Sequence, residues 1–146
     1  MENLLISSTG VVKICDLGMA KILCKKGSTY DDTLFKAIGS RHYRCPEMYL
    51  EEKNGFSGFS ADVWALGCVF FCLVTGDLPY PYVRGGSRKK HIRKICSSRV
   101  PDSKRLAGEL KVLIHGMLEK NPSDRKTLRD VRKWVSDRIQ GDDNGV

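Results

Sequence analysis

Short apolar runs on either side of a polar turn dominate the first fifteen positions. Residues 4–6 and 11–15 are rich in side chains that favour strands, and the Ser-Ser-Thr-Gly run at 7–10 has the composition of a turn. If Thr9 and Gly10 form the centre of a two-residue turn, opposed positions sum to nineteen, which places Asn3 directly across from Asp16. The pattern therefore predicts a β-hairpin.

From residue 16 to residue 47 the chain loses any regular spacing of apolar side chains and fills with Gly, Lys, Ser, Thr and Asp. Irregular segments of this length in a compact domain usually carry function. We therefore expect binding or regulation in this stretch.

The most apolar segment, residues 61–75, is preceded by Ser60 and followed by Gly76. Serine suits the N-cap of a helix and glycine suits the residue after its end, so these two residues predict the helix bounds. Fifteen helical residues span about 22 Å, whereas the hydrocarbon core of a membrane is about 30 Å thick. We therefore expect a buried central helix, ended by the Leu-Pro-Tyr-Pro run at 78–81.

Three weaker helices are predicted at 87–96, 104–118 and 127–139, the last two from apolar residues at helical spacing. The polar tail at 141–146 is expected to be disordered. Together these elements predict a mainly α fold with a short β-hairpin, in a single domain over residues 1–140.

Composition is that of an ordinary globular domain, with 41% hydrophobic and 29% charged residues. The net charge of +8 attracts acidic partners over long range but identifies no site. The six cysteines form no C-x-x-C pair and have no zinc-site spacing, which favours reduced thiols in an intracellular protein. No signal peptide is visible, so we expect the cytoplasm, with the nucleus left open.

Asn3 and Asp16 are the candidate chemistry of the hairpin. Side chains opposed across two strands lie roughly 5 Å apart at Cβ. An amide oxygen and a carboxylate at the open end of a hairpin are hard ligands suited to magnesium, which is often completed by waters and nucleotide phosphates. The alternative to a magnesium site is that Asn3 and Asp16 are only polar residues at the ends of two strands.

Five motifs carry a resemblance to the protein kinases. In chain order they are Glu-Asn-Leu-Leu at 2–5, Asp-Leu-Gly at 16–18, Gly-Ser-Arg-His-Tyr-Arg-Cys-Pro-Glu at 39–47, Asp-Val-Trp-Ala-Leu-Gly at 62–67 and Met-Leu-Glu-Lys-Asn-Pro-Ser-Asp-Arg at 117–125. They resemble the end of the catalytic loop, the D-F-G motif, the end of the activation segment, the central helix and the turn before the last helices. Asp16 follows Asn3 by thirteen residues, as the family requires. The chain thus resembles the C-terminal lobe of the kinase fold, with Leu17 and Cys45 as mild apolar departures.

The resemblance implies ATP and Mg²⁺ as cofactors. Asn3 and Asp16 would hold the metal on the ATP phosphates as electrostatic residues. Leu5 and Cys15, beside them on the strands, would floor the adenine site, although ordinary hairpin core is the simpler interpretation. Cys15 is expected to be an inert thiol rather than a reactive one.

The same resemblance assigns Glu2, Gly39 and Ser40 to substrate binding, and the Gly-Ser-x-x-Tyr form is typical of kinases that act on protein serine and threonine. Glu47 and Arg125 would form a buried ion pair with a structural role. A further structural residue is Asp62, near the N-terminus of the central helix.

Hydroxyls at 28–30 and 33 lie in the expected activation loop. Many relatives carry the activating threonine at 36–38, where this sequence has Lys-Ala-Ile, so Thr33 is the best remaining candidate phosphosite.

A basic run comprises Arg84, Arg88, Lys89, Lys90, Arg93 and Lys94. Such a run is most often a solvated helix face; the alternative is docking of an acidic protein partner. No nucleic-acid motif or stacking platform accompanies the charge, so neither nucleic acid nor membrane is an expected partner.

A working kinase also needs a glycine-rich loop, a strand lysine and a catalytic aspartate, which this sequence does not contain. Isolated activity is therefore not expected. Two hypotheses remain: a segment of an active serine/threonine kinase, or a non-catalytic kinase-like lobe that binds proteins or regulates an intact relative.

Overall fold

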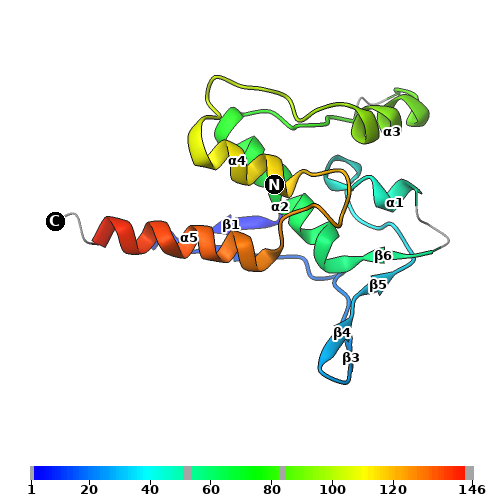
Figure 1. Ribbon diagram of the computed structural model, residues 1–146, viewed down its shortest axis with the longest axis horizontal. Coiled ribbons are helices and arrows are strands. Elements are labelled where there is room, and N and C mark those ends of the chain that lie inside the picture. Colours follow the sequence, from blue (N-terminus) through cyan, green and yellow to red (C-terminus); the bar gives the residue numbers. More distant parts are fainter. Residues whose placement is uncertain (1, 51–53, 83–84, 144–146) are drawn as a thin grey trace. The chain divides into compact units, whose positions relative to one another are not determined.

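The computed structural model describes residues 2–50, 54–82 and 85–143, without the side chains of residues 141–143 (Figure 1). Its contacts divide the chain into two compact units, residues 1–32 and residues 33–146. Each unit is described by itself below. The first contains the predicted hairpin and the second contains the predicted helices.

The first unit consists of two small hairpins. Strands β1 (Leu4–Ile6) and β2 (Val12–Ile14) pair antiparallel, as do β3 (Cys24–Lys26) and β4 (Thr29–Asp31). The second hairpin was not predicted, because its strands are short and polar. It turns at Gly27, whose φ of 61° favours glycine, and Lys26 forms an ion pair with Asp31 across the strands.

The register of the first hairpin differs by one from the prediction. Leu4 is opposite Ile14 and Leu5 is opposite Lys13, so opposed positions sum to eighteen. Ser7 N donates to Val11 O at 2.9 Å, which closes a three-residue loop, and Gly10 ends that loop with φ 79°. A three-residue loop with a left-handed glycine is a common hairpin solution, and it pairs Asn3 with Cys15 instead of Asp16.

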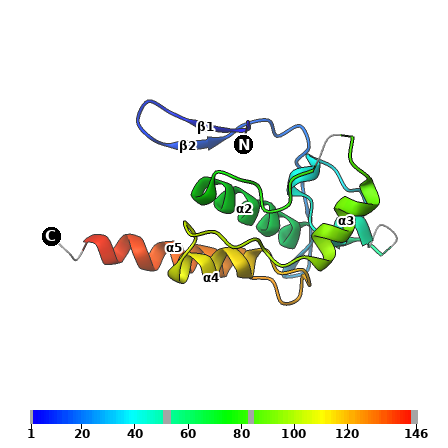
Figure 2. The same ribbon diagram turned by 90° about the horizontal axis from the view of Figure 1, so that it is seen from above.

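The second unit is mostly helical. Its elements are β5 (Thr33–Leu34), the 3₁₀ turn η1 (Arg41–Tyr43), α1 (Glu47–Leu50), β6 (Phe56–Ser57), α2 (Gly58–Thr75), α3 (Arg88–Ser97), α4 (Gly108–Met117) and α5 (Leu128–Asp143). Strands β5 and β6 pair antiparallel. Figure 2 shows α2 lying beside α4. Val131 of α5 packs in one apolar cluster with Val63 of α2 and Leu113 of α4.

Helix α2 is the core of this unit, as the apolar run predicted. Trp64 and Cys68 on α2 are fully buried, and so are Ile114 and Met117 on α4. By length and composition α2 could also cross a membrane, but a core helix with these buried contacts meets the same criteria. The close approach of α4 depends on Gly67, because a Cβ there would lie 3.0 Å from the Cβ of Met117.

The observed helix ends follow from capping. Ser57, not the predicted Ser60, caps α2: its Oγ accepts from Ser60 N at 3.1 Å, and α2 therefore begins three residues early. Gly76 ends α2 as predicted, with φ 86° and its N–H bonded to Cys72 O. Helix α3 matches its prediction within one residue.

Helix α4 begins at Gly108, four residues after the predicted start at 104, because the preceding residues form a separate turn in which Leu106 N donates to Ser103 O. Helix α5 starts after a capping box, since Asp130 Oδ2 accepts from Thr127 N at 2.7 Å. It continues to Asp143, beyond the predicted domain boundary at 140, and residues 144–146 of the expected tail lie outside the described residues.

Candidate functional site

Asn3 and Asp16 lie side by side at the open end of the first hairpin. The amide Nδ2 of Asn3 is 3.5 Å from Oδ2 of Asp16, and Cys15 N donates to Asn3 O at 2.9 Å. Because Cys15 is the residue opposite Asn3, a regular strand would point Asp16 to the other face. Instead Asp16 has a left-handed backbone with φ 60°, which brings its carboxylate to Asn3.

The left-handed conformation of Asp16 has a local support. Its Oδ1 accepts from Gly18 N at 3.3 Å, an Asx turn of the kind that lets aspartate occupy this region of the backbone. Asp16 is the single non-glycine residue with positive φ among residues 2–50, 54–82 and 85–143. The backbone strain is thus located at the candidate site, where it holds one carboxylate oxygen and leaves the other facing Asn3.

The donor set fits magnesium. Both side chains are exposed, the carboxylate offers oxygen, and a half-turn of the Asn3 amide would present its oxygen in place of the nitrogen. Magnesium keeps several waters and takes only one or two protein ligands at nucleotide sites. No group of three or more His, Cys, Asp or Glu side chains gathers at a possible metal site in the described part of the chain.

Other residues of the first hairpin share the face on which Asn3 lies. Asn3 and Leu5 are two residues apart in an extended segment, so their side chains lie on the same face of the hairpin. The residues opposite them are Cys15 and Lys13. The observed register therefore places Leu5 and Cys15 on the Asn3 face. Leu5 is 53% exposed and Cys15 is half-buried, so Leu5 is available for contact with a ligand. Glu2, beside Asn3, is exposed.

The second unit contains the other candidate residues. Gly39 has φ 86°, and its carbonyl accepts from both Nε and Nη2 of Arg44, at 3.1 and 2.8 Å. Ser40 is exposed and directly precedes η1. The guanidinium thus fixes the backbone at Gly39 and leaves the Ser40 hydroxyl on the surface.

Glu47 and Arg125 form the predicted buried ion pair. Nη1 and Nη2 of Arg125 donate to Oε1 and Oε2 of Glu47 at 2.5 and 2.9 Å, and the two side chains are 0% and 2% exposed. Arg125 also donates to Ser60 O and Glu119 O, which satisfies the rest of the guanidinium. The pair joins α1 to the start of α2 and to the turn before α5.

Asp62 and Thr33 stand apart from these contacts. Asp62 lies in the first turns of α2, where neighbouring atoms displace water from its carboxyl and raise its pKa. Thr33 is exposed and lies in β5, opposite Ser57, rather than in an irregular loop.

Lys120 was not among the residues that the sequence analysis singled out. Its Nζ lies 3.8 Å from the ring centre of Tyr80 and 4.8 Å from that of Trp64, and it donates to the Tyr80 hydroxyl at 2.5 Å. Burial lowers the pKa of Lys120 to about 8. Trp64 and Tyr80 are stacked, with ring centres 5.8 Å apart. Nothing in the residue spacing marks this lysine as enclosed by aromatic rings.

Comparison with known proteins decides the family. A model of the protein kinase domain matches residues 1–135. The chain belongs to the protein kinase family. The spacing of Asn3 and Asp16 and the buried Glu47–Arg125 pair therefore occur in a kinase chain, as the five motifs predicted.

Three relatives show the extent of the similarity. This chain is 32% identical to serine/threonine-protein kinase GRIK2 of Arabidopsis thaliana, over 92% of the present sequence. It is 33% identical to human cyclin-dependent kinase-like 4, over 88% of the present sequence. It is 30% identical to CBL-interacting protein kinase 28 of Oryza sativa subsp. japonica over 90%. The kinase chain covers 32%, 32% and 29% of these three relatives, so it spans about a third of their length.

Proposed function

We propose that this chain is the C-terminal lobe segment of a kinase that transfers the γ-phosphoryl group of ATP to serine or threonine of a protein. The observation that carries the proposal is the 3.5 Å approach of Asn3 and Asp16 at the end of a hairpin. The Gly-Ser-x-x-Tyr motif at 39–43 and the similarity to a relative named as a serine/threonine-protein kinase agree with it. On this proposal, Ser40 and Gly39 contact the substrate chain.

In the proposed reaction Asn3 and Asp16 would hold magnesium through the Asn3 amide and the Asp16 carboxylate. The metal would supply positive charge next to the phosphates, where negative charge develops during transfer. The Asx turn at Gly18 keeps the Asp16 carboxylate in place before the nucleotide arrives, which lowers the ordering cost of binding. Leu5 and Cys15, on the Asn3 face, offer apolar contact to the adenine ring.

Manganese tests the metal site directly, because it replaces magnesium and broadens nearby NMR signals. We expect Mn²⁺ with ADP to broaden the amide signals of Asn3, Asp16 and Gly18 in the purified chain. Asp16→Ala should abolish the broadening, while Asp102→Ala, which removes an exposed carboxylate of the second unit, should leave it unchanged. Equal broadening in the parent and Asp16→Ala would refute the site.

Phosphotransfer separates the active kinase from the non-catalytic lobe. We propose that the isolated chain gives only background transfer from labelled ATP to serine or threonine peptides, since the glycine-rich loop, strand lysine and catalytic aspartate must come from elsewhere. Transcripts sequenced across the Met1 codon should encode those motifs in frame upstream if the kinase is active. A transcript without them favours the lobe that binds or regulates an intact relative.

Two further features belong to this proposal. Phosphorylation of Thr33 would add negative charge at an exposed position in β5, within the β5–β6 pair. Mass spectrometry of the protein isolated from the organism that produces it would detect this modification. We also propose that this kinase is cytoplasmic, with the nucleus left open, which fluorescence imaging of a tagged chain would test.

A further inference from the structure

The exposed side chains of α3 are mostly basic. Its ten residues contain no acidic side chain and five basic ones, namely Arg88, Lys89, Lys90, Arg93 and Lys94. His91 and Ile95 are buried at helical spacing, so α3 is anchored along that line and the basic residues are exposed. Arg84 of the predicted basic run lies outside the described residues.

Four of the five basic side chains of α3 form no ion pair within the part of the chain that the structure describes. Lys89, Lys90, Arg93 and Lys94 have no carboxylate partner among residues 2–50, 54–82 and 85–143. Basic residues in the first turn of a helix also oppose its dipole, and the Ser87 side chain makes no capping hydrogen bond. Among the described residues, α3 thus carries an excess of positive charge that an acidic ligand would relieve.

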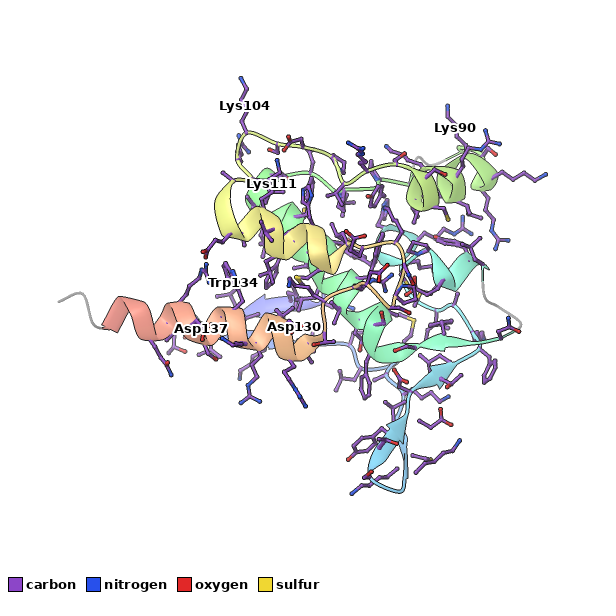
Figure 3. The ribbon with its side chains drawn as sticks, in the orientation of Figure 1. Lys90, Lys104, Lys111, Asp130, Trp134 and Asp137 are labelled. Carbon is purple, nitrogen blue, oxygen red and sulfur yellow. The ribbon has the colours of Figure 1, made fainter. Side chains whose placement is uncertain are left out.

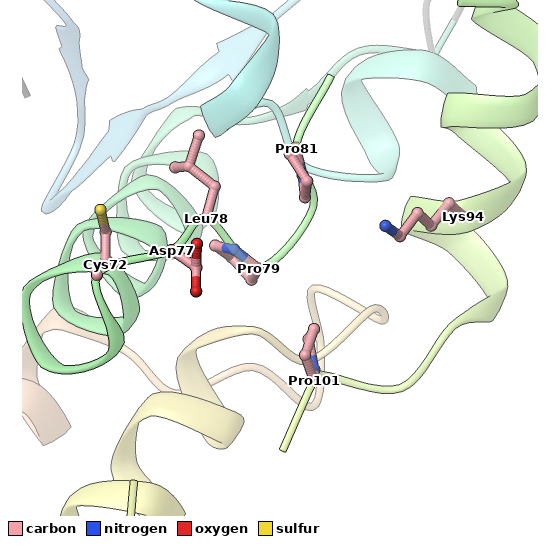
Figure 4. Close-up of a pocket in the computed structure, with 8 residues that line it drawn as sticks. Cys72, Asp77, Leu78, Pro79, Pro81, Lys94 and Pro101 are labelled. Carbon is pink, nitrogen blue, oxygen red and sulfur yellow. The ribbon is translucent and has the colours of Figure 1, made fainter. Parts of the chain in front are cut away.

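A groove adjoins this surface and shares Lys94 with it. Lys94 reaches from α3 toward Pro79 and Pro81, and Pro101 and Leu78 complete an apolar lining (Figure 4). The groove has a volume of about 570 Å³, in the range of roughly 300–1,000 Å³ that ordinary ligand sites occupy. Asp77 lies at the side near the end of α2, away from Lys94.

We propose that the α3 surface and this groove together form a docking site for an acidic peptide segment of a partner protein. An apolar side chain of the segment packs against Pro79, Pro81 and Pro101, and its flanking carboxylates pair with Lys94 and Arg93. The inference names a partner class and does not depend on phosphotransfer, so its failure would leave the manganese experiment unaffected.

The groove chemistry favours a peptide over a nucleic acid. A phosphate backbone that followed the cations into the groove would meet the Asp77 carboxylate, and the groove lining contains no aromatic side chain on which a base could stack. A membrane surface would satisfy the lysines but would not fill a recess between proline rings. A short segment with one apolar anchor between acidic residues satisfies both parts of the site.

Selection from a displayed library of random peptides tests the proposal without a known partner. The full 146-residue chain serves as bait, with Lys94→Glu as the test variant and Lys104→Glu as the matched control. Lys104 is exposed, and Figure 3 shows it well separated from Lys90 on α3. Both variants change the net charge equally, so they separate a specific site from general attraction. Circular dichroism first establishes that both variants unfold like the parent.

We expect the selected peptides to share acidic residues around an apolar one. Fluorescence polarisation of the consensus peptide should show binding weakened about tenfold by Lys94→Glu and by removal of the apolar residue, but changed less than about twofold by Lys104→Glu. Cys72→Phe, which narrows the groove from α2, should also weaken binding.

Three results would overturn the proposal. One is selection without enrichment of acidic residues, and another is an equal loss of binding in Lys94→Glu and Lys104→Glu. The third is binding of polyuridylate or of phosphatidylserine vesicles more tightly than any selected peptide, with the same dependence on Lys94, which would assign the surface to nucleic acid or to a membrane.

Discussion

Arg125 and Glu47 are 78 positions apart in the chain, yet their side chains form a two-point ion pair that excludes water. Both oxygens of Glu47 accept from the guanidinium, and the exposed fractions of the two side chains are 2% and 0%. A charge pair in this setting contributes little when intact but costs much when one partner is removed, because the other charge stays buried. The pair therefore controls whether the second unit folds.

We expect Arg125→Met to lower the free energy of unfolding by about 3–5 kcal/mol, since it leaves the Glu47 carboxylate buried without its partner. Urea unfolding followed by circular dichroism measures the loss. The double variant of Glu47→Gln with Arg125→Met should lose less than the sum of the two single changes, because neither residue is then left as an unpaired charge.

An exposed ion pair provides the control. Lys133 and Asp137 are paired at 2.9 Å on the surface of α5, and Lys133→Met should cost less than about 1 kcal/mol. A loss in Arg125→Met no larger than that in Lys133→Met would contradict the structural role of the buried pair.

Gly67 allows a second test of packing in the same unit. Alanine there would bring a Cβ to 3.0 Å from Met117 and 3.1 Å from Leu118, in a region without room for displacement. Although alanine favours helices by about 1 kcal/mol over glycine, we expect a net loss of about 1–2 kcal/mol from overpacking.

Gly116 is the matched control for Gly67. An added Cβ there would lie 2.9 Å from Cγ of Lys126, so this half-buried side chain would have to change rotamer, whereas Met117 and Leu118 beside Gly67 are buried. We therefore expect Gly116→Ala to lose less stability than Gly67→Ala in thermal unfolding. The packing argument fails if Gly116→Ala loses as much as Gly67→Ala or more.

The sequence predicted the helices of the second unit well because their burial follows local patterns. The apolar run at 61–75 and the glycine after it determined α2 and its end, whereas the start was missed because Ser57 and Ser60 are both good caps. The choice between them depends on the β5–β6 pair, which brings Ser57 to the helix and which the local sequence does not show.

Asn3 and Asp16 approach each other as predicted, although the predicted register of the hairpin was wrong. A two-residue turn would have placed Asn3 across from Asp16, but the loop has three residues and the two side chains meet through the left-handed backbone of Asp16. Loop length in a Ser-Ser-Thr-Gly turn is not determined by composition, so a one-residue error in register is expected. Lys120 was missed because its enclosure depends on two distant aromatic residues.

The buried amine of Lys120 makes stability depend on pH. Its pKa is lowered from 10.5 to about 8, so above pH 8 the folded chain releases a proton that the unfolded chain still holds. The free energy of unfolding should therefore increase as pH rises from about 8 to 9, by at most about 1.4 kcal/mol per pH unit from this group. Ionisation of the Cys45 and Cys68 thiols in the unfolded chain, where their ordinary pKa is 9.0, partly opposes this gain below pH 9 and outweighs it above, since burial raises the pKa of both in the folded chain.

Urea unfolding at several pH values measures this dependence. We expect Lys120→Met to remove the increase between pH 8 and 9, because no amine then titrates beside Tyr80, and Lys104→Met to preserve it. An unchanged slope in Lys120→Met would show that the amine of the folded chain is not perturbed.

The six free cysteines differ in their access to a thiol reagent. Cys24 is exposed on β3, whereas burial raises the pKa of Cys68 to about 12 and keeps its thiol protonated near neutral pH. We expect Cys24 to give the fastest phase of reaction with a disulfide dye, and the buried Cys45 and Cys68 to react only as the chain unfolds. Cys24→Ser should remove the fast phase, and Cys96→Ser, at a half-buried position where burial raises the thiol pKa, should retain it. A fast phase that persists in Cys24→Ser would place the reactive thiol elsewhere and show that the surface at β3 is covered.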